Sequence, residues 1–139
     1  MGATDAREAL IADSQFGGGS TTWAPATWYL GLSTSVPNED GTNFTEPSGG
    51  SYGRVSIPNN STSFPGAGIE GGQTVKKNGI KFTFPNPTGS WGTIAYYGFF
   101  TASSGGTPQY FGPLDTTISP KAGNTPVEFD VNQLVMAWD

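Results

Sequence analysis

Acidic side chains are the groups in this sequence most able to do chemistry, because it contains no histidine and no cysteine. Glu39 and Asp40 are adjacent in the chain. Glu128 and Asp130 alternate with an apolar residue and would share one face of a strand. Two carboxyl groups can hydrolyse a glycosidic bond when an apolar wall raises the pKa of one of them. Nothing near either pair indicates such a wall, so we predict that the protein is not an enzyme and uses no cofactor.

The stretch PNEDGTNF is rich in oxygen-bearing side chains that precede a glycine, a pattern that could bind calcium. It lacks the ligand spacing of an EF-hand loop and the bidentate glutamate that closes such a loop. We favour a β-turn, in which Asn38 and Asp40 bond to nearby backbone and Gly41 takes a positive φ. The sequence therefore predicts no metal site.

Aromatic residues make up 13% of the chain, more than a small β domain needs for its core. Aromatic rings on a β surface can stack on sugar rings, and they are also common in protein interfaces. Trp23 is the best candidate for a partner contact, because it lies in a glycine-rich segment. A carbohydrate-binding β-sandwich module is therefore an alternative function.

The formal net charge is −5, and the main basic cluster is Lys76, Lys77 and Lys81. Nucleic-acid binding requires a basic stripe that displaces counterions from phosphates. Lysines at a strand end more often protect an exposed sheet edge. No apolar run approaches the roughly 20 residues of a membrane-spanning helix. We expect neither nucleic acid nor membrane as a partner.

The chain begins with a predicted helix over Thr4 to Ala12. Its apolar face is narrow and centres on Leu10, so the helix must dock on its own domain or on another chain. The segment FGGGSTTWAP, from Phe16 to Pro25, follows it and is typical of a hinge. Residues 1–26 are therefore predicted to form a helix and a flexible arm.

Strand patterns begin at Thr27, where large apolar residues alternate with small or polar ones. Further strands are predicted over residues 52–57, 81–84, 94–100 and 109–112, with 94–100 and 109–112 as a hairpin. The end of the chain, residues 127–138, is predicted to form either two strands joined by a tight turn at Asn132–Gln133 or one strand with a bulge. A loop fills residues 58–73. Residues 27–139 are predicted to form an all-β, antiparallel two-sheet sandwich of jelly-roll type, with an immunoglobulin-like sandwich as the alternative.

Several stretches, in order along the chain, resemble a family of small tailed-bacteriophage virion proteins. They are APATWYLGLSTSVPNEDGTNFTEPSGGSYGRVSI, GIKFTFPNPTGSWGTIAYYGFFTASSGG and QYFGPLDTTISPKAGNTPVEFD. The family is often labelled tail-fibre-like and includes capsid cement, or decoration, proteins. The segment FPGAGIEGGQTVKKNG departs from the pattern, which leaves the loop before Lys81 unassigned.

The resemblance implies a structural, non-enzymatic virion protein made in the cytoplasm of the bacterial host. Its first implied function is a cement protein on the outer capsid surface, bound to the major capsid protein. A tail or tail-fibre component is the alternative. A homodimer or another homo-oligomer on the shell is a further expectation.

Contacts are expected from three regions of the chain. One is the long loop from Thr34 to Gly50, which turn residues would fix in one shape before binding. The second is the arm, and the third is an aromatic face through which copies could pair. The candidate contact residues are Leu10, Phe16, Trp23, Asn38, Glu39, Asp40, Tyr97 and Phe99.

Overall fold

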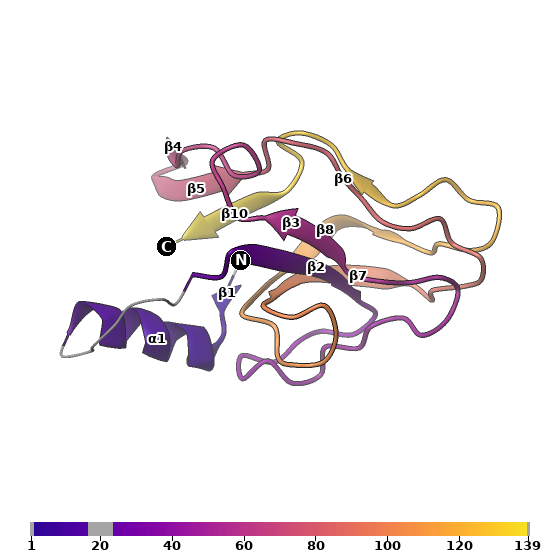
Figure 1. Ribbon diagram of the computed structural model, residues 1–139, viewed down its shortest axis with the longest axis horizontal. Helices are drawn as coiled ribbons and strands as arrows, with labels where there is room; N and C mark the ends of the chain where they lie inside the picture. The colour runs from indigo at the N-terminus through magenta and orange to yellow at the C-terminus, as the bar shows by residue number, and fades with distance from the viewer. Residues whose placement is uncertain (1, 17–23, 139) are drawn as a thin grey trace.

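Antiparallel strands form the framework of the protein in the computed structural model, which describes residues 2–16 and 24–138. The larger sheet has the order β1 (Gly2–Ala3), β8 (Tyr110–Ile118), β7 (Ile94–Phe100), β2 (Thr27–Ser33) and β3 (Val55–Pro58). Two small sheets form a second layer. The first has the order β10 (Val135–Trp138), β5 (Gln73–Lys77) and β4 (Gly68–Glu70). The second consists of β6 (Phe82–Thr83) and β9 (Glu128–Phe129). Figure 1 shows the small sheets above the larger one. The predicted all-β antiparallel sandwich is confirmed.

The core lies between these layers and is supplied by alternate residues of β2 and β7. Leu30 lies opposite Phe99, and Leu32 lies opposite Tyr97, so these side chains share one face of the larger sheet. All four are at most 4% exposed. The second layer closes the core from above. The buried cluster consists of Leu30, Leu32, Ile57, Phe82, Phe84, Trp91, Ile94, Tyr97, Phe99, Tyr110, Phe129, Leu134 and Met136.

The outer face of the larger sheet is also covered, which explains why β7 is apolar on both faces. Phe44 from the long loop packs edge-on against Phe100, with ring centroids 5.1 Å apart. A Cβ atom at Gly98 would lie 2.6 Å from the Phe44 ring, so only glycine leaves room for it. Loops therefore serve as a third layer over β2 and β7.

A hairpin of β4 and β5 occupies part of the region predicted to be a loop. Gly71 and Gly72 both have positive φ, at 57° and 81°, and they join Glu70 to its partner Gln73. A Gly-Gly pair is a strong signal for a two-residue hairpin turn. Every residue of β4 is exposed, so the strand has no apolar alternation that could have revealed it.

The final predicted strand region divides into two strands that join different sheets. β9 pairs with β6, whereas β10 pairs with β5. The reversal between them is held by the buried Asn78. Its Nδ2 donates to the carbonyl oxygens of Phe129 and Asp130, at 3.3 and 2.8 Å, and its Oδ1 accepts from the Leu134 amide at 2.9 Å. The turn predicted around Asn132 is confirmed, with a φ of 66° at that residue.

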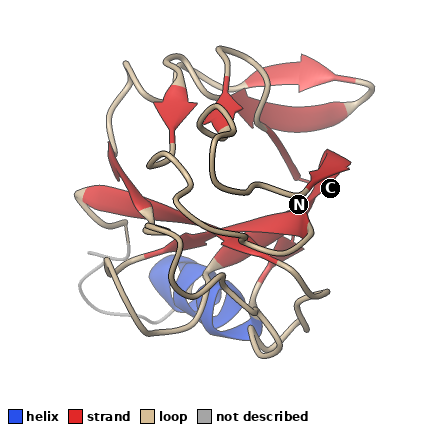
Figure 2. Ribbon diagram, turned by 90° about the vertical axis from the view of Figure 1, so that its right-hand side faces the viewer, coloured by secondary structure: helices blue, strands red, loops and turns tan. Residues whose placement is uncertain are grey.

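Helix α1 (Asp5–Gln15) lies on the side of the larger sheet away from the small sheets (Figures 1 and 2). The strand β1, immediately before it, pairs with β8 at Gly2–Phe111 and Ala3–Tyr110. The helix therefore docks on its own domain, one of the two possibilities that the sequence left open.

Candidate functional site

The long loop from Thr34 to Gly50 is built as a folded-back ribbon with ordered polar contacts. The Thr34 amide donates to the Thr45 carbonyl at 2.9 Å, and the Thr45 amide donates to the Ser33 hydroxyl at 3.0 Å. The Ser35 hydroxyl donates to Thr45 Oγ1 at 2.8 Å. The two arms of the loop thus hold each other without regular strand pairing.

The tip of this loop is the β-turn that the sequence predicts. The Gly41 amide donates to the Asn38 carbonyl at 2.9 Å, and Gly41 has a φ of 83°. The Asp40 carboxylate accepts from the Thr42 hydroxyl at 2.6 Å and from the Thr42 amide at 3.0 Å. These hydrogen bonds to Thr42 lower the pKa of Asp40, because they favour its charged form. Asp40 therefore serves the turn.

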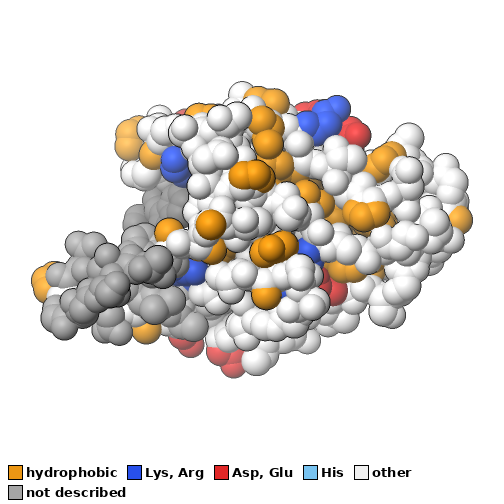
Figure 3. Space-filling view, viewed as in Figure 1, with side chains coloured by type: hydrophobic (Ala, Val, Ile, Leu, Met, Phe, Trp, Pro, Cys, Tyr) orange, Lys and Arg blue, Asp and Glu red, His pale blue; other side chains and the backbone are white. Residues whose placement is uncertain are grey.

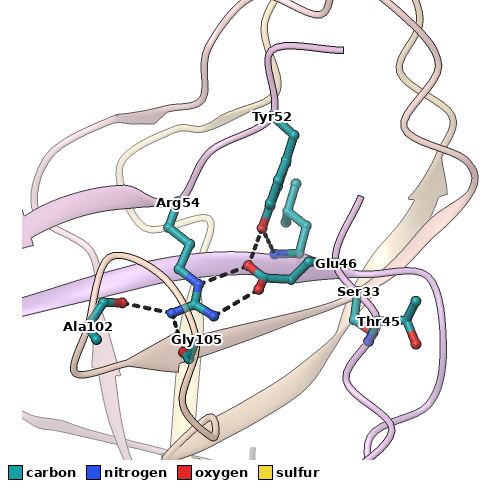
Figure 4. A network of polar contacts seen from close by, with 8 residues as sticks. Ser33, Thr45, Glu46, Tyr52, Arg54, Ala102 and Gly105 are labelled. Atoms are coloured by element: carbon teal, nitrogen blue, oxygen red, sulfur yellow. Dashed lines mark hydrogen bonds and ion pairs between the residues drawn. The ribbon is translucent and has the colours of Figure 1, made fainter. Parts of the chain in front are cut away.

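A partly buried ion pair between Arg54 and Glu46 anchors the base of the loop. Arg54 Nε and Nη2 donate to the two carboxylate oxygens of Glu46, at 2.9 and 2.8 Å. The Tyr52 hydroxyl donates to the same carboxylate at 2.7 Å and accepts from the Leu32 amide at 3.0 Å (Figure 4). Burial raises the pKa of Tyr52, so this hydroxyl keeps its proton. The side chain of Arg54 is only 3% exposed.

Arg54 also fixes a second loop, between β7 and β8. Its Nη1 donates to the carbonyls of Ala102 and Gly105, at 2.7 and 2.9 Å. The guanidinium lies 3.4 Å from the centroid of the Phe100 ring, within cation–π range. One side chain thus holds two loops on the outer face of the sheet. Sequence analysis did not single out Arg54, since a lone arginine among glycines carries no pattern.

Helix α1 contacts the tip of the long loop, which brings two predicted contact regions together. The Asp5 amide donates to the Glu39 carbonyl at 3.3 Å. Carboxylate oxygens of Asp5, Glu8 and Glu39 all lie within 4.8 Å of one another, and all three residues are exposed. Three such carboxylates could share one cation, but exposed acidic groups are common without an ion. We call Asp5, Glu8, Glu39 and Asp40 the acidic surface.

The side chain of Arg7 on helix α1 packs against aromatic rings of the sandwich. It is 1% exposed, and its guanidinium lies 5.3 Å from the centroid of the Trp28 ring and 5.7 Å from that of Tyr110. Burial lowers the pKa of Arg7, and Tyr110 opposes this effect. No pattern in the sequence indicates this contact, because Arg7 occupies a position typical of the polar face of a helix.

The predicted contact residues divide into three groups. Phe16 is 85% exposed at the end of α1, and Asn38, Glu39 and Asp40 are exposed at the loop tip. Tyr97 and Phe99 are 4% and 2% exposed, since they point into the sandwich, so they offer no surface for pairing. In this fold neither ring lies on the outer surface. Trp23 lies outside the described residues, and so does the side chain of Leu10.

The second acidic pair, Glu128 and Asp130, forms ion pairs with Lys81. Lys81 Nζ lies 3.2 Å from a Glu128 carboxylate oxygen and 3.3 Å from one of Asp130. The hydrogen bonds that Lys81 donates to Glu128 and to Asp130 raise the pKa of Lys81, because they favour its charged form. All three side chains are exposed, and they form a surface ion-pair group.

The space-filling view adds the distribution of side chains on one face. Hydrophobic side chains are scattered there in small groups among polar ones, and acidic side chains appear along the lower edge (Figure 3). The visible face is therefore mixed and mostly uncharged.

Comparison with protein families gives a match over nearly the whole chain. The model of the podophage GP4 fiber I protein gp80 family matches residues 2–137, which include both the helix and the sandwich. The chain belongs to this family. A comparison with curated proteins found no match.

Membership of the podophage GP4 fiber I protein gp80 family confirms that this is a structural protein of a tailed-phage virion. The match extends over the segment around residues 64–79 that the sequence resemblance left unassigned. Within the described residues, no helix has both the length and the apolar character needed to cross a lipid bilayer.

Proposed function

We propose that the protein is a fibre component of a podophage particle and acts by protein contact without catalysis. The observation that carries this proposal is the family match over residues 2–137, whose description names a fibre protein. The match includes the N-terminal helix together with the sandwich, so the likeness extends over the functional surface as well as the core.

The capsid cement function, ranked first from the sequence, is now second to the fibre function. Both are structural roles in one virion, and both fit an acidic protein that binds other proteins more readily than the packaged genome. The family description favours the fibre. The major capsid protein remains the expected partner only for the cement function.

The shape of the long loop supports a role in protein contact. Its tip is held by the turn at Asn38–Thr42, and its base is held by Arg54 and Glu46. A loop ordered before binding loses less conformational entropy on association. The acidic surface beside it would meet a basic surface on a neighbouring virion protein.

Association between copies of the chain is part of this proposal, as expected for a fibre. It cannot use Tyr97 and Phe99, which are buried. We propose that copies contact each other through exposed apolar residues such as Phe16, which is 85% exposed.

Location on the particle tests the fibre proposal directly. Purified virions would be labelled with gold-conjugated antibodies against this protein and viewed by electron microscopy. We expect label on the tail or its fibres, with few copies in each particle. Label spread over the whole shell would reject the fibre and support the cement function. An antibody against the major capsid protein provides the control for shell labelling.

Charge reversal tests the contact surface in the same particles. The substitution Glu39→Lys is expected to reduce incorporation of the protein into virions, because it changes the charge of the exposed acidic surface. The matched control is Glu70→Lys, an exposed acid on β4 in the opposite layer. Equal incorporation of the two variants would remove the acidic surface from the proposal.

A further inference from the structure

The three lysines of the basic cluster have different surroundings. Lys77 pairs with Glu70 at 2.9 Å, and Lys81 pairs with Glu128 and Asp130. Lys76 instead donates to two backbone carbonyls, those of Phe64 at 3.3 Å and Pro65 at 2.9 Å. Among the described residues it has no carboxylate partner. An ammonium group has three donors, so one remains for a ligand.

Lys76 lines a cavity of about 300 Å³ at the end of the sandwich where β5 and β10 cover the larger sheet. The walls are aromatic: Trp28 of β2, Phe99 of β7, Tyr110 of β8 and Phe64 of the loop after β3. Trp28 meets Phe99 and Tyr110 edge-on, with ring centroids 6.0 and 5.8 Å apart. Ligand pockets have volumes of about 300–1,000 Å³. This one is therefore the size for a single small ring.

Polar groups stand along one rim of this cavity, at Asn59, Asn60 and Ser61. Asn59 Nδ2 donates to the Pro25 carbonyl at 2.8 Å, and Asn60 Oδ1 accepts from the amides of Thr62 and Ser63. These bonds fix both amide groups, and each amide group keeps an opposite end with the capacity for another hydrogen bond. Aromatic walls with fixed amides at the rim suit a ligand that has an apolar ring face and hydroxyl edges.

The charge of the cavity selects among such ligands. Among the described residues, no aspartate or glutamate lines it, although the whole chain has a net charge of −5. Lys76 contributes one positive charge at the wall. A cation beside an aromatic cavity favours an anion. A neutral sugar would leave the Lys76 donor without a charged acceptor.

We propose that this cavity binds one carboxylate-bearing sugar unit of the hexuronate type. The sugar ring packs against the aromatic wall, its hydroxyl groups bond to the rim amides, and its carboxylate accepts from Lys76. The site differs from the acidic surface of α1 and the long loop, and it does not depend on the position of the protein in the virion. The inference therefore stands or fails separately from the fibre function.

Titration with three probes tests the ligand class on the full chain. The probes are glucuronate, glucose and acetate, and the readout is the movement of backbone amide resonances in NMR spectra. We expect glucuronate to bind in the millimolar range and to move the resonances of Lys76, Asn60 and Ser61. Glucose should bind more weakly, since it lacks the anion. If acetate matches glucuronate, the cavity is an anion site only and the sugar proposal is wrong.

Neighbouring lysines provide a matched pair of variants. Lys76→Gln should weaken glucuronate binding about tenfold or more, because a hydrogen bond to a charged group is lost. Lys77→Gln removes the same charge from the same strand but away from the cavity, and it should leave binding unchanged. Equal effects of the two variants would overturn the proposal. So would the absence of resonance shifts in the unmodified protein, a result that does not depend on whether either variant folds.

Discussion

At the scale of single residues, the structure depends on polar side chains placed where the sequence shows no pattern. Arg54 satisfies Glu46, two loop carbonyls and the face of Phe100 at once. Asn78 does the same for the turn between β9 and β10, with contacts more than fifty positions along the chain. A buried polar group with all its partners fixes one arrangement, because each alternative leaves a group unsatisfied.

Removing the charge of Glu46 is expected to destabilise the protein far more than removing that of an exposed acid. Glu46→Gln leaves the guanidinium of Arg54, whose side chain is 3% exposed, without its counter-charge. Loss of one member of a fully buried pair costs about 3–5 kcal/mol, and the 25% exposure of Glu46 lowers the expected cost to about 2 kcal/mol. The measurement is the free energy of unfolding from urea titration at neutral pH.

The control for this prediction is Glu70→Gln, which breaks the exposed pair with Lys77. Exposed pairs contribute roughly 0–1 kcal/mol. If the two variants unfold at the same urea concentration, the Glu46–Arg54 pair does not hold the loops.

At the scale of elements, the short helix is stable only because it docks. α1 has eleven residues, and an isolated helix of that length is marginal in water. Strand β1 fixes its beginning by pairing with β8, and Arg7 reaches the rings of Trp28 and Tyr110. The segment expected to be a free arm is, over residues 2–16, part of the folded domain.

Arg7→Ala is expected to release α1 without unfolding the sandwich. The change removes the cation–π contacts and part of the helix's buried surface, together worth about 1–2 kcal/mol. Amide hydrogen exchange should therefore accelerate in residues 5–15, while exchange in β2 and β7 stays slow. The exposed neighbour Glu8→Ala is the control. Unchanged protection of α1 in Arg7→Ala would show that β1 alone suffices to hold the helix.

At the scale of the whole molecule, the sandwich has three layers: the small sheets, the larger sheet, and the loops over its outer face, with α1 at one end (Figure 1). Both faces of β7 are therefore buried, and tyrosines enter the core. Burial raises the pKa of Tyr97 from 10.0 to about 12. Burial also raises the pKa of Tyr52 and Tyr110. The free energy of unfolding should consequently fall as the pH becomes alkaline.

The direction of this dependence follows from proton binding. The unfolded chain loses the Tyr97 proton near its ordinary pKa of 10.0, while the folded chain keeps it until about pH 12. Between these two pH values the folded state holds more protons than the unfolded state. The contribution of Tyr97 to the free energy of unfolding is therefore complete below pH 10.0 and is lost as pH rises through about 12. Tyr97→Phe should therefore lose less stability over this interval than the unmodified protein, by on the order of 2 kcal/mol.

Urea unfolding at neutral pH and at several alkaline values measures this difference. Tyr52 and Tyr110 remain in the variant, so the slope should fall without disappearing. Parallel stability curves for the two proteins would show that the burial of Tyr97 does not control the alkaline limit.

The division between sequence and structure is clearest in the strands. Trp28, Leu30 and Leu32 alternate with smaller residues, and the apolar run of β7 on both faces indicates a central strand, which it is. Strand β4 was not predicted, because all its residues are exposed and show no apolar alternation. Alternation of apolar residues predicts buried strands, whereas no such alternation marks a strand at an exposed sheet edge.

The loop tip gives the same lesson for the candidate site. Its turn could be predicted, because Asp40, Gly41 and Thr42 interact over a few positions. Its neighbourhood could not: Glu39 meets Asp5 only when helix and loop fold onto one sheet. For the aromatic residues, the abundance of rings in the sequence favoured a surface position for Tyr97 and Phe99. The structure instead buries both side chains inside the sandwich.

Sequence by itself determined the β class, the main hairpin, the turn chemistry and the absence of histidine and cysteine, because these depend on residue types or on neighbours along the chain. Tertiary structure alone decided which lysines find carboxylates, which rings are covered and where α1 docks. Those outcomes depend on contacts between distant positions, and such contacts are set by how whole sheets pack.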